Sequence, residues 1–207
     1  HSSIPDGASL MDAVKAQRPT CLLGLSTVKD VFTEEIVREV ASYTDRPIIM
    51  PMSNPTSKSE CTPEQAYTWT DGRAIVATGS PFTAVTLKDG RTLYPSQCNN
   101  MYVFPGIGLA ASVAGVKNIT DKMLYVAAVA CAEAMSEAEI ADGRTFPAIQ
   151  RIRDVSHLVA CAVIEEALEK DLTTKIPKDI TSEGLKDLVA RKMYFPQYVP
   201  LVDPRNH

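Results

Sequence analysis

The sequence predicts an α/β protein, with a parallel sheet and flanking helices followed by a helical C-terminal extension. Three short apolar runs, of the kind found in strands buried on both faces, occur at residues 20–26, 46–53 and 74–80. Amphipathic helical patterns separate these runs. Strands that alternate with helices are joined by right-handed crossovers, so we expect their sheet to be parallel.

The helices of the first half carry recognisable end signals. The pattern at residues 8–19 stops at a proline, and residues 33–43 begin with acidic residues that suit the helix dipole. In the segment 62–72, Thr62 is placed to cap the helix, Pro63 takes its first position and Gln65 closes a capping box. These signals predict three helices between and before the strands.

Beyond about residue 104 the patterns are helical, with a proline-rich tail that holds one short helix. Two domains are therefore expected, a sheet domain over 1–103 and a helical extension over 104–207. A parallel sheet of three strands with an open edge is small for an independent domain, which indicates that the sheet is only part of a larger one.

Composition narrows the class of protein. The chain has 207 residues, a formal net charge of −4 and no lysine- or arginine-rich run, so we expect neither a nucleic-acid nor a membrane partner. No apolar run reaches the ~18 residues of a membrane span, and the first residues show no secretory pattern. The cytoplasm is the expected location, with the mitochondrion as the alternative.

The reactive side chains show no spacing typical of a metal or redox site. The five cysteines are at least thirty residues apart, without a C-x-x-C or zinc pattern, so we interpret them as free thiols of a reducing compartment. His157 is the only histidine away from the chain ends. It lies in a long helical pattern, and we expect it to be structural and partly exposed.

A G-x-G-x-x-A pattern at residues 106–111 resembles a dinucleotide-binding turn after a plausible strand at 101–104. Pro105 stands between that strand and the first glycine, no strand follows the helix, and no acidic residue follows at the spacing needed to bind a ribose. We therefore expect these small residues to form a close-packed helix face instead of a phosphate site.

Polar residues follow each expected strand, where a parallel sheet binds its ligands. Asn54 follows the second strand, Ser26 the first and Ser80 the third. An uncharged amide there can donate to a carboxylate and accept from a ribose or nicotinamide. Asn-Pro and Ser-Pro also form turns, so a purely structural role for Asn54 and for the pair Asn99 and Asn100 stays open.

Three stretches together resemble the malic enzymes: S-N-P-T-S followed by G-S-P-F, then C-N-N-M-Y-V-F-P-G, then G-R-T-F-P-A-I-Q-R-I-R-D-V-S. The resemblance covers about residues 1–170. It implies a partial Rossmann-like NAD(P)-binding domain and the oxidative decarboxylation of L-malate to pyruvate and CO2, with NAD or NADP and with Mg²⁺ or Mn²⁺. The full-length enzyme is expected to be a homo-oligomer.

The resemblance also assigns roles to individual residues. Asn54 matches an asparagine beside malate and the nicotinamide, and Asn99 with Asn100 matches the pair at malate. Gly24, Leu25 and Ser26 match a strand end close to the cofactor. Cys98 stands where the family commonly has a glycine.

The catalytic tyrosine and lysine, the metal ligands and the glycine-rich loop of the family would lie upstream of this chain. Glu133, Glu137 and Glu139 are expected to face solvent and not to form a substitute metal site. We therefore expect a C-terminal part of a malic enzyme that is inactive alone. The alternative is a stand-alone module that binds a small carboxylate or serves assembly; an amino-acid dehydrogenase-like cofactor domain is disfavoured by the order of the motifs.

Overall fold

The computed structural model describes residues 4–195. Its contacts separate two compact units, the first made of His1–Tyr102 with Cys131–Ile152 and the second of Val103–Ala130 with Arg153–His207. The first change of unit falls beside the expected boundary at 103/104, while residues 131–152 return to the first unit. The division into a sheet domain and a helical extension stays a prediction.

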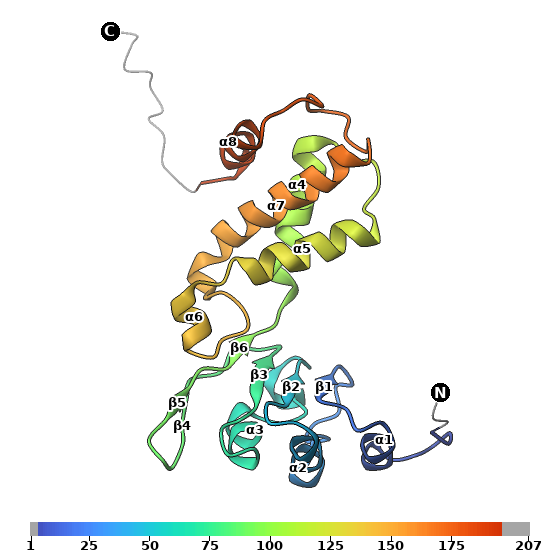
Figure 1. The fold of residues 1–207 in the computed structure, drawn as a ribbon, viewed down its shortest axis with the longest axis vertical. Helices are drawn as coiled ribbons and strands as arrows, with labels where there is room; N and C mark the ends of the chain where they lie inside the picture. Colours follow the sequence, from blue (N-terminus) through green and yellow to red (C-terminus); the bar gives the residue numbers. More distant parts are fainter. Residues whose placement is uncertain (1–3, 196–207) are drawn as a thin grey trace. The chain divides into compact units, whose positions relative to one another are not determined.

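A parallel sheet in the order β1-β2-β3-β6 forms the centre of the first unit, which confirms the predicted α/β class (Figure 1). Its strands are β1 (Cys21–Gly24), β2 (Ile48–Pro51), β3 (Ile75–Thr78) and β6 (Ser96–Gln97). No sequence pattern predicts the fourth strand, because it consists of two polar residues. The strand expected at 101–104 is absent: η2 (Asn100–Tyr102) and the start of α4 occupy these residues.

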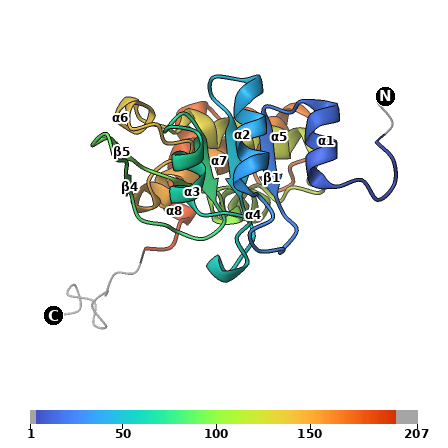
Figure 2. The same cartoon turned by 90° about the horizontal axis from the view of Figure 1, so that it is seen from below.

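Three helices cover one face of this sheet, α1 (Leu10–Gln17), α2 (Glu34–Tyr43) and α3 (Pro63–Trp69) (Figures 1 and 2). Helix α1 packs on α2, and α2 packs on α3. The predicted capping box of α3 is confirmed, since Thr62 and Gln65 each bond to the other's backbone N–H. The core between helices and sheet includes Val37, Val40, Ile49, Ala66 and Val76.

Strand β1 is buried on one face only, contrary to the expectation from its apolar run. Its Leu22 is buried, whereas Leu23 is 56% exposed. The physical reason is that α1, α2 and α3 lie on a single face of the sheet (Figures 1 and 2), so the side chains of the edge strand β1 are covered on that face alone. An unbroken apolar sequence therefore does not by itself distinguish one buried face from two.

The rest of the first unit consists of short elements. A two-stranded antiparallel hairpin joins β4 (Val85–Thr86) to β5 (Thr92–Leu93), and η1 (Thr56–Lys58) follows β2. Helix α6 (Glu137–Ala141) and η3 (Ile149–Arg151) belong to the returning segment 131–152. This segment forms hydrogen bonds to Ser96 in β6 and thereby holds the strand in place.

The second unit is helical in the part that the structure describes, as predicted. It contains α4 (Phe104–Ala114), most of α5 (Asp121–Glu133), α7 (Ile152–Glu169) from Arg153 on, and α8 (Ser182–Lys192). Helix α4 packs against α8, and buried side chains of α7 include Val159, Val163 and Ile164. The end of the proline-rich tail, residues 196–207, lies outside the described residues.

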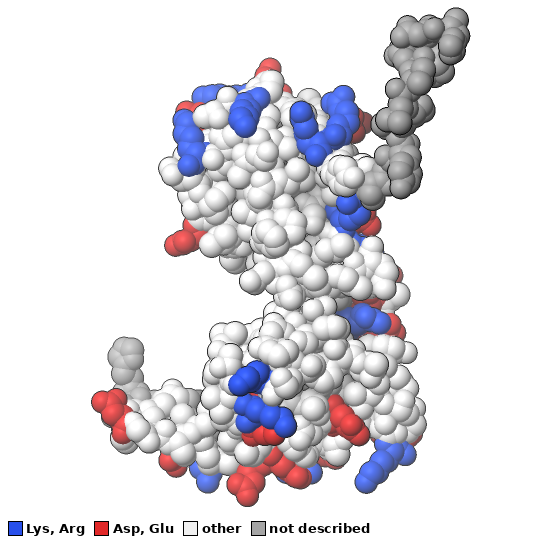
Figure 3. Space-filling model, turned by 180° about the vertical axis from the view of Figure 1, so that it is seen from behind, with Lys and Arg blue, Asp and Glu red and all other residues white. Residues whose placement is uncertain are grey.

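On the face drawn in Figure 3, basic and acidic side chains both occur, and broad areas between them carry no charged side chain. Among residues 4–195, no helix combines the length and the apolar character needed to cross a bilayer.

Candidate functional site

A row of backbone hydrogen bonds ties the carboxyl ends of the four parallel strands together. It consists of Met52 N–H to Gly24 C=O at 3.0 Å, Gly79 N–H to Pro51 C=O at 3.3 Å, and Cys98 N–H to Thr78 C=O at 2.8 Å. Residues Ser26, Asn54, Ser80 and Asn99 each follow this row within two positions. Because adjacent strands are about 4.8 Å apart, Asn54 after β2 and Asn99 after β6 start on the order of 10 Å apart, with the end of β3 between them.

Asn54 is exposed, and its amide oxygen is engaged by the neighbouring strand end. Ser80 Oγ donates to Asn54 Oδ1 at 2.5 Å. A Cβ on Gly79 would overlap the carbonyl oxygen of Met52 and lie 3.0 Å from Asn54 Nδ2. Only glycine at position 79 allows the β2 and β3 ends to approach this closely, so the local sequence G-S sets the environment of the Asn54 amide.

Asn99 is half-buried and forms a turn at the start of η2. Its Oδ1 accepts the N–H of Met101 at 3.1 Å, and its carbonyl accepts the N–H of Tyr102 at 3.2 Å. Asn100 follows in η2 and is exposed. The turn geometry and a binding role are compatible, because the turn uses the oxygen of the Asn99 amide and leaves its NH2 group unused within the described residues.

Gly24, Leu25 and Ser26 lie on the other side of Asn54, at the end of β1. Gly24 is buried, while Leu25 is 72% exposed and Ser26 is exposed. The next residue, Thr27, has a left-handed backbone with φ of 59° and donates its N–H to Ser53 Oγ at 2.9 Å. A β-branched residue rarely adopts this conformation, so the turn is held by its hydrogen bonds against an unfavourable backbone.

Glu60, which no sequence pattern singles out, organises this turn. Its carboxylate is completely buried and accepts the N–H of Ser26 at 3.2 Å, the N–H of Ser53 at 3.3 Å and the hydroxyl groups of both serines. A Cβ on Gly24 would lie 2.6 Å from Glu60 Oε2. The glycine thus makes room for the carboxylate, and the carboxylate joins the ends of β1 and β2.

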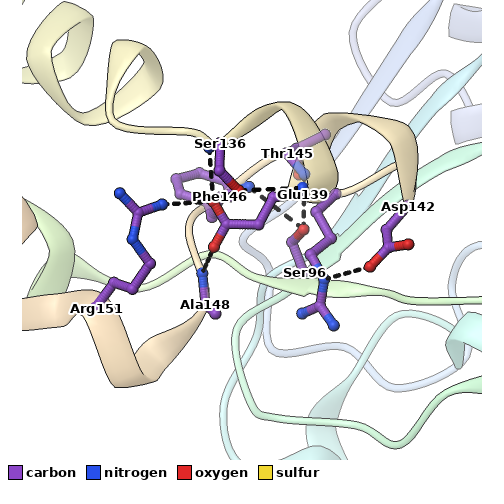
Figure 4. A network of polar contacts seen from close by, with 9 residues as sticks. Ser96, Ser136, Glu139, Asp142, Thr145, Phe146, Ala148 and Arg151 are labelled. Carbon is purple, nitrogen blue, oxygen red and sulfur yellow. Dashed lines mark hydrogen bonds and ion pairs between the residues drawn. The ribbon is translucent and has the colours of Figure 1, made fainter.

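A second buried carboxylate braces the Asn99 side of the sheet edge (Figure 4). Glu139 accepts from Ala148 N–H at 2.7 Å and from Ser136 N–H at 2.8 Å, and pairs with Arg151 at 2.7 Å. This corrects the expectation that Glu139 faces solvent; Glu133 and Glu137 are exposed as expected. Burial raises the pKa of Glu139, but these hydrogen bonds and the Arg151 charge outweigh it and lower the pKa to about 2.

The braced loop contacts the strand that leads to Asn99. Ser96 Oγ in β6 accepts from Thr145 N–H at 2.8 Å and from Phe146 N–H at 3.3 Å (Figure 4). Tyr102 donates its hydroxyl to the carbonyl of Pro147 at 2.6 Å and packs on the ring of Phe146. Both ends of the 96–102 segment are thereby fixed, which holds the Asn99 turn in place.

The thiols and the histidine have surroundings typical of structural groups. Residues 4–195 contain five free cysteines, and burial raises the pKa of Cys98, which precedes Asn99. Cys61 is buried with a pKa raised to about 12, first by burial and then by the charges of Glu60 and Asp30. His157 is half-buried, and its Nε2 lies 2.9 Å from the carbonyl oxygen of Lys186, in accord with the expected structural role.

The G-x-G-x-x-A pattern lies inside helix α4 and not in a phosphate-binding turn. Pro105 occupies the first turn of the helix, and a Cβ on Gly106 would meet Val159 Cγ1 at 2.6 Å. Gly108, in contrast, has open space around it. Close packing therefore explains the glycine at position 106. The expectation that Gly108 belongs to the same close-packed face is wrong.

The described residues do not fit a divalent cation, since no group of three or more histidine, cysteine, aspartate or glutamate side chains is placed to hold one. Glu60 and Glu139 are both saturated by internal donors. What the sheet edge offers is uncharged amide and hydroxyl groups, which suit an anionic organic ligand better than a metal ion.

Comparisons with known proteins agree on one family. The sequence model described as malic enzyme, NAD binding domain, matches residues 1–168. The chain is 44% identical to the NAD-dependent malic enzyme of Proteus mirabilis over 195 residues and 43% identical to the NADP-dependent malic enzyme of Dictyostelium discoideum over 190 residues. These matches cover 93% and 92% of the chain but 33% and 34% of the relatives, so the chain spans about a third of their length.

Solved structures share the fold of this chain. The chain matches the malic enzyme of Pyrococcus horikoshii with a TM-score of 0.64 at 25% identity, covering 86% of this chain and 36% of that one. It matches the Entamoeba histolytica malic enzyme with a TM-score of 0.67 at 24% identity, covering 86% and 33%.

Proposed function

This chain belongs to the malic enzyme family, and on that basis we propose that it is the C-terminal part of the NAD(P)-binding domain of an enzyme that converts L-malate to pyruvate and CO2. The observation that carries the proposal is the sheet edge itself. Two asparagine amides, Asn54 and Asn99, flank the end of β3, and both have their oxygen engaged internally. Their NH2 groups have no hydrogen-bond partner among residues 4–195, and we propose that they donate to a ligand.

Malate suits such an edge, because each of its carboxylates accepts hydrogen bonds and donates none. We propose that Asn54, Asn99 and Asn100 bind malate. Gly24, Leu25, Ser26 and Asn54 would lie beside the cofactor, which supplies the oxidant when bound. Neutral amides bring no positive charge to the ligand, so a malate anion between them stays charged. Their hydrogen bonds fix its orientation.

We propose that the metal ligands and the catalytic side chains of the enzyme lie outside this chain. Because no described cluster fits Mg²⁺ or Mn²⁺, we propose that the metal ligands belong to a preceding segment, together with the catalytic tyrosine, the lysine and the glycine-rich loop. The chain spans about a third of the length of these relatives. The part proposed for this chain is to bind and orient malate and the cofactor.

Location and assembly are also proposals. We place the enzyme in the cytoplasm, with the mitochondrion as the alternative because the human and mouse relatives at 41% identity are named mitochondrial. We propose a homo-oligomer for the whole enzyme. Subcellular fractionation and the mass of the native particle in solution test these two points.

The substrate assignment is tested by removing each amide in the whole enzyme. A hydrogen bond to a charged ligand contributes roughly 1.5–3 kcal/mol, so Asn54→Ala and Asn99→Ala should each lower kcat/KM for malate by about ten- to a hundredfold. The measurement is steady-state NAD(P) reduction against malate concentration, with the melting temperature recorded in parallel. Unchanged malate kinetics in both variants would reduce these residues to turn formers.

A further inference from the structure

Ser80 lies where it can decide which end of the Asn54 amide meets a ligand. Its hydroxyl donates to Asn54 Oδ1 at 2.5 Å. An amide has one acceptor end and one donor end, and rotation by half a turn exchanges them. Asn54 is exposed, and among residues 4–195 no other hydrogen bond of its side chain opposes that rotation.

The Ser80 hydroxyl is itself presented from a fixed backbone. Thr78, which is only 1% exposed, donates its hydroxyl to the Ser80 carbonyl at 2.7 Å. Gly79, between them, is held against the β2 end by its N–H bond to Pro51. The backbone of Ser80 is therefore held in place, which keeps its hydroxyl beside the Asn54 amide.

The Asn99 amide is also bound through its oxygen, but its partner is a backbone group and not a side chain. Its oxygen accepts a backbone N–H, that of Met101, and a backbone N–H can only donate. The orientation of the Asn99 amide is thus set by the chain itself. At Asn54 the partner is a side-chain hydroxyl, which can donate or accept and which in this structure donates to Oδ1, so the orientation there depends on one replaceable residue.

We propose that Ser80 is a positioning residue: by donating to Asn54 Oδ1 it holds the amide with its NH2 group available to donate to the ligand carboxylate. A hydroxyl that donates to the amide oxygen also polarises the amide, which strengthens the bond that its NH2 group donates. The inference rests on the proposed function, because it assigns a ligand carboxylate to Asn54. It adds a residue that does not itself touch the ligand.

The test is a double-mutant cycle in the whole enzyme, read as kcat/KM for malate. Ser80→Ala should lower it about three- to tenfold, the range expected for one neutral hydrogen bond. Ser80→Thr, which keeps the hydroxyl, should retain most of the activity. In an Asn54→Ala background, Ser80→Ala should change kcat/KM by less than about twofold, because Ser80 acts only through the missing amide.

Thr83→Ala is the matched control, since Thr83 is exposed in the same loop and no hydrogen bond of its hydroxyl is found in the described part of the chain. Its kcat/KM should equal that of the wild type. If Ser80→Ala does not fold, Ser80→Cys has a similar size and a weak donor, and the same loss is expected. An equal loss from Ser80→Ala with and without Asn54, or no loss at all, would overturn the inference.

The proposed function fails in a different way. A wild-type enzyme that does not reduce NAD(P) with malate would remove both proposals before any variant is compared. Malate activity in the wild type with additive effects of Ser80 and Asn54 would leave the function standing and remove only the role of Ser80.

Discussion

Glu60 joins the ends of two strands through one buried carboxylate. Its four accepted hydrogen bonds come from Ser26, which we assign to the cofactor, and from Ser53, which directly precedes Asn54. A buried carboxylate that accepts backbone N–H groups from two strand ends fixes the positions of these ends relative to each other. The geometry of the turn at Gly24 to Thr27 thus depends on a residue that touches neither proposed ligand.

Replacing this carboxylate by an amide should destabilise the protein. In Glu60→Gln, the new NH2 group faces N–H and O–H donors, so at least one of them loses its acceptor, at a cost of about 1–3 kcal/mol. The melting temperature of the whole enzyme measures the loss. Glu64→Gln is the control, because Glu64 is exposed and close in sequence; a drop no larger than that of the control would contradict the assigned role.

The buried carboxylate of Glu139 leads to a prediction about how the melting temperature depends on pH. Its pKa of about 2 in the folded protein lies below the ordinary value of 4.5, so the ionised form contributes stability above pH 4.5. That contribution is lost as pH falls from 4.5 toward 2. Glu139→Gln should therefore have a lower melting temperature at neutral pH and a shallower decline of melting temperature between about pH 5 and 3.

The control for this pH profile is Glu137→Gln on the same helix, where the side chain is exposed. It should reproduce the wild-type profile of melting temperature against pH. Identical profiles for Glu139→Gln and the wild type would show that the Glu139 carboxylate does not supply the acid sensitivity.

In helix α4, two glycines of the same sequence pattern have different surroundings. Gly106 is crowded, because an added Cβ would meet Val159 Cγ1 at 2.6 Å and the carbonyl oxygen of Ser156 at 2.8 Å, whereas Gly108 has open space. Gly106→Ala should destabilise the protein by about 1–3 kcal/mol through overpacking. Gly108→Ala should stabilise it by up to about 1 kcal/mol, because alanine is the better helix former.

The two variants form a matched pair, since they make the same chemical change two residues apart in one helix. Their melting temperatures should shift in opposite directions. A rise in KM for the cofactor with an unchanged melting temperature in Gly108→Ala would instead favour a phosphate-binding role for this glycine pattern.

At the scale of the whole molecule, the prediction concerns what the chain can do alone. Residues 1–207 offer a sheet edge with amides and hydroxyls, and their described part has no cluster that fits a metal ion. We therefore expect no malate-dependent NAD(P) reduction from the isolated chain with Mn²⁺. Turnover above that of a mock purification, assayed beside the whole enzyme, would contradict the assignment of the catalytic groups to a preceding segment.

Much of the fold could be predicted because its signals are local. The capping box of Thr62 and Gln65 links residues three apart, and the alternation of strands with helices needs only a window of the sequence. The carboxyl-edge location of Asn54 follows from the same alternation. The two-residue strand β6 could not be predicted in this way, because its pairing with β3 decides it. The helical start at Phe104 did have a local signal, Pro105 in the first turn, but the apolar run at 101–104 favours a strand and concealed it.

By itself, the sequence determined the parallel α/β class, the helix caps, the family and the positions of the asparagines along the chain. Only the tertiary structure decided that Ser80 holds Asn54, that Glu60 is buried beside Gly24, and that Glu139 braces the loop at Ser96. The hydrogen bonds behind these features join residues far apart in the sequence: Ser80 and Asn54 are separated by 26 positions, Glu60 and Ser26 by 34, and Phe146 and Ser96 by 50. Periodicity and caps depend on neighbours within a turn or two of the chain, whereas a hydrogen bond between distant residues exists only once the sheet has brought its strand ends together.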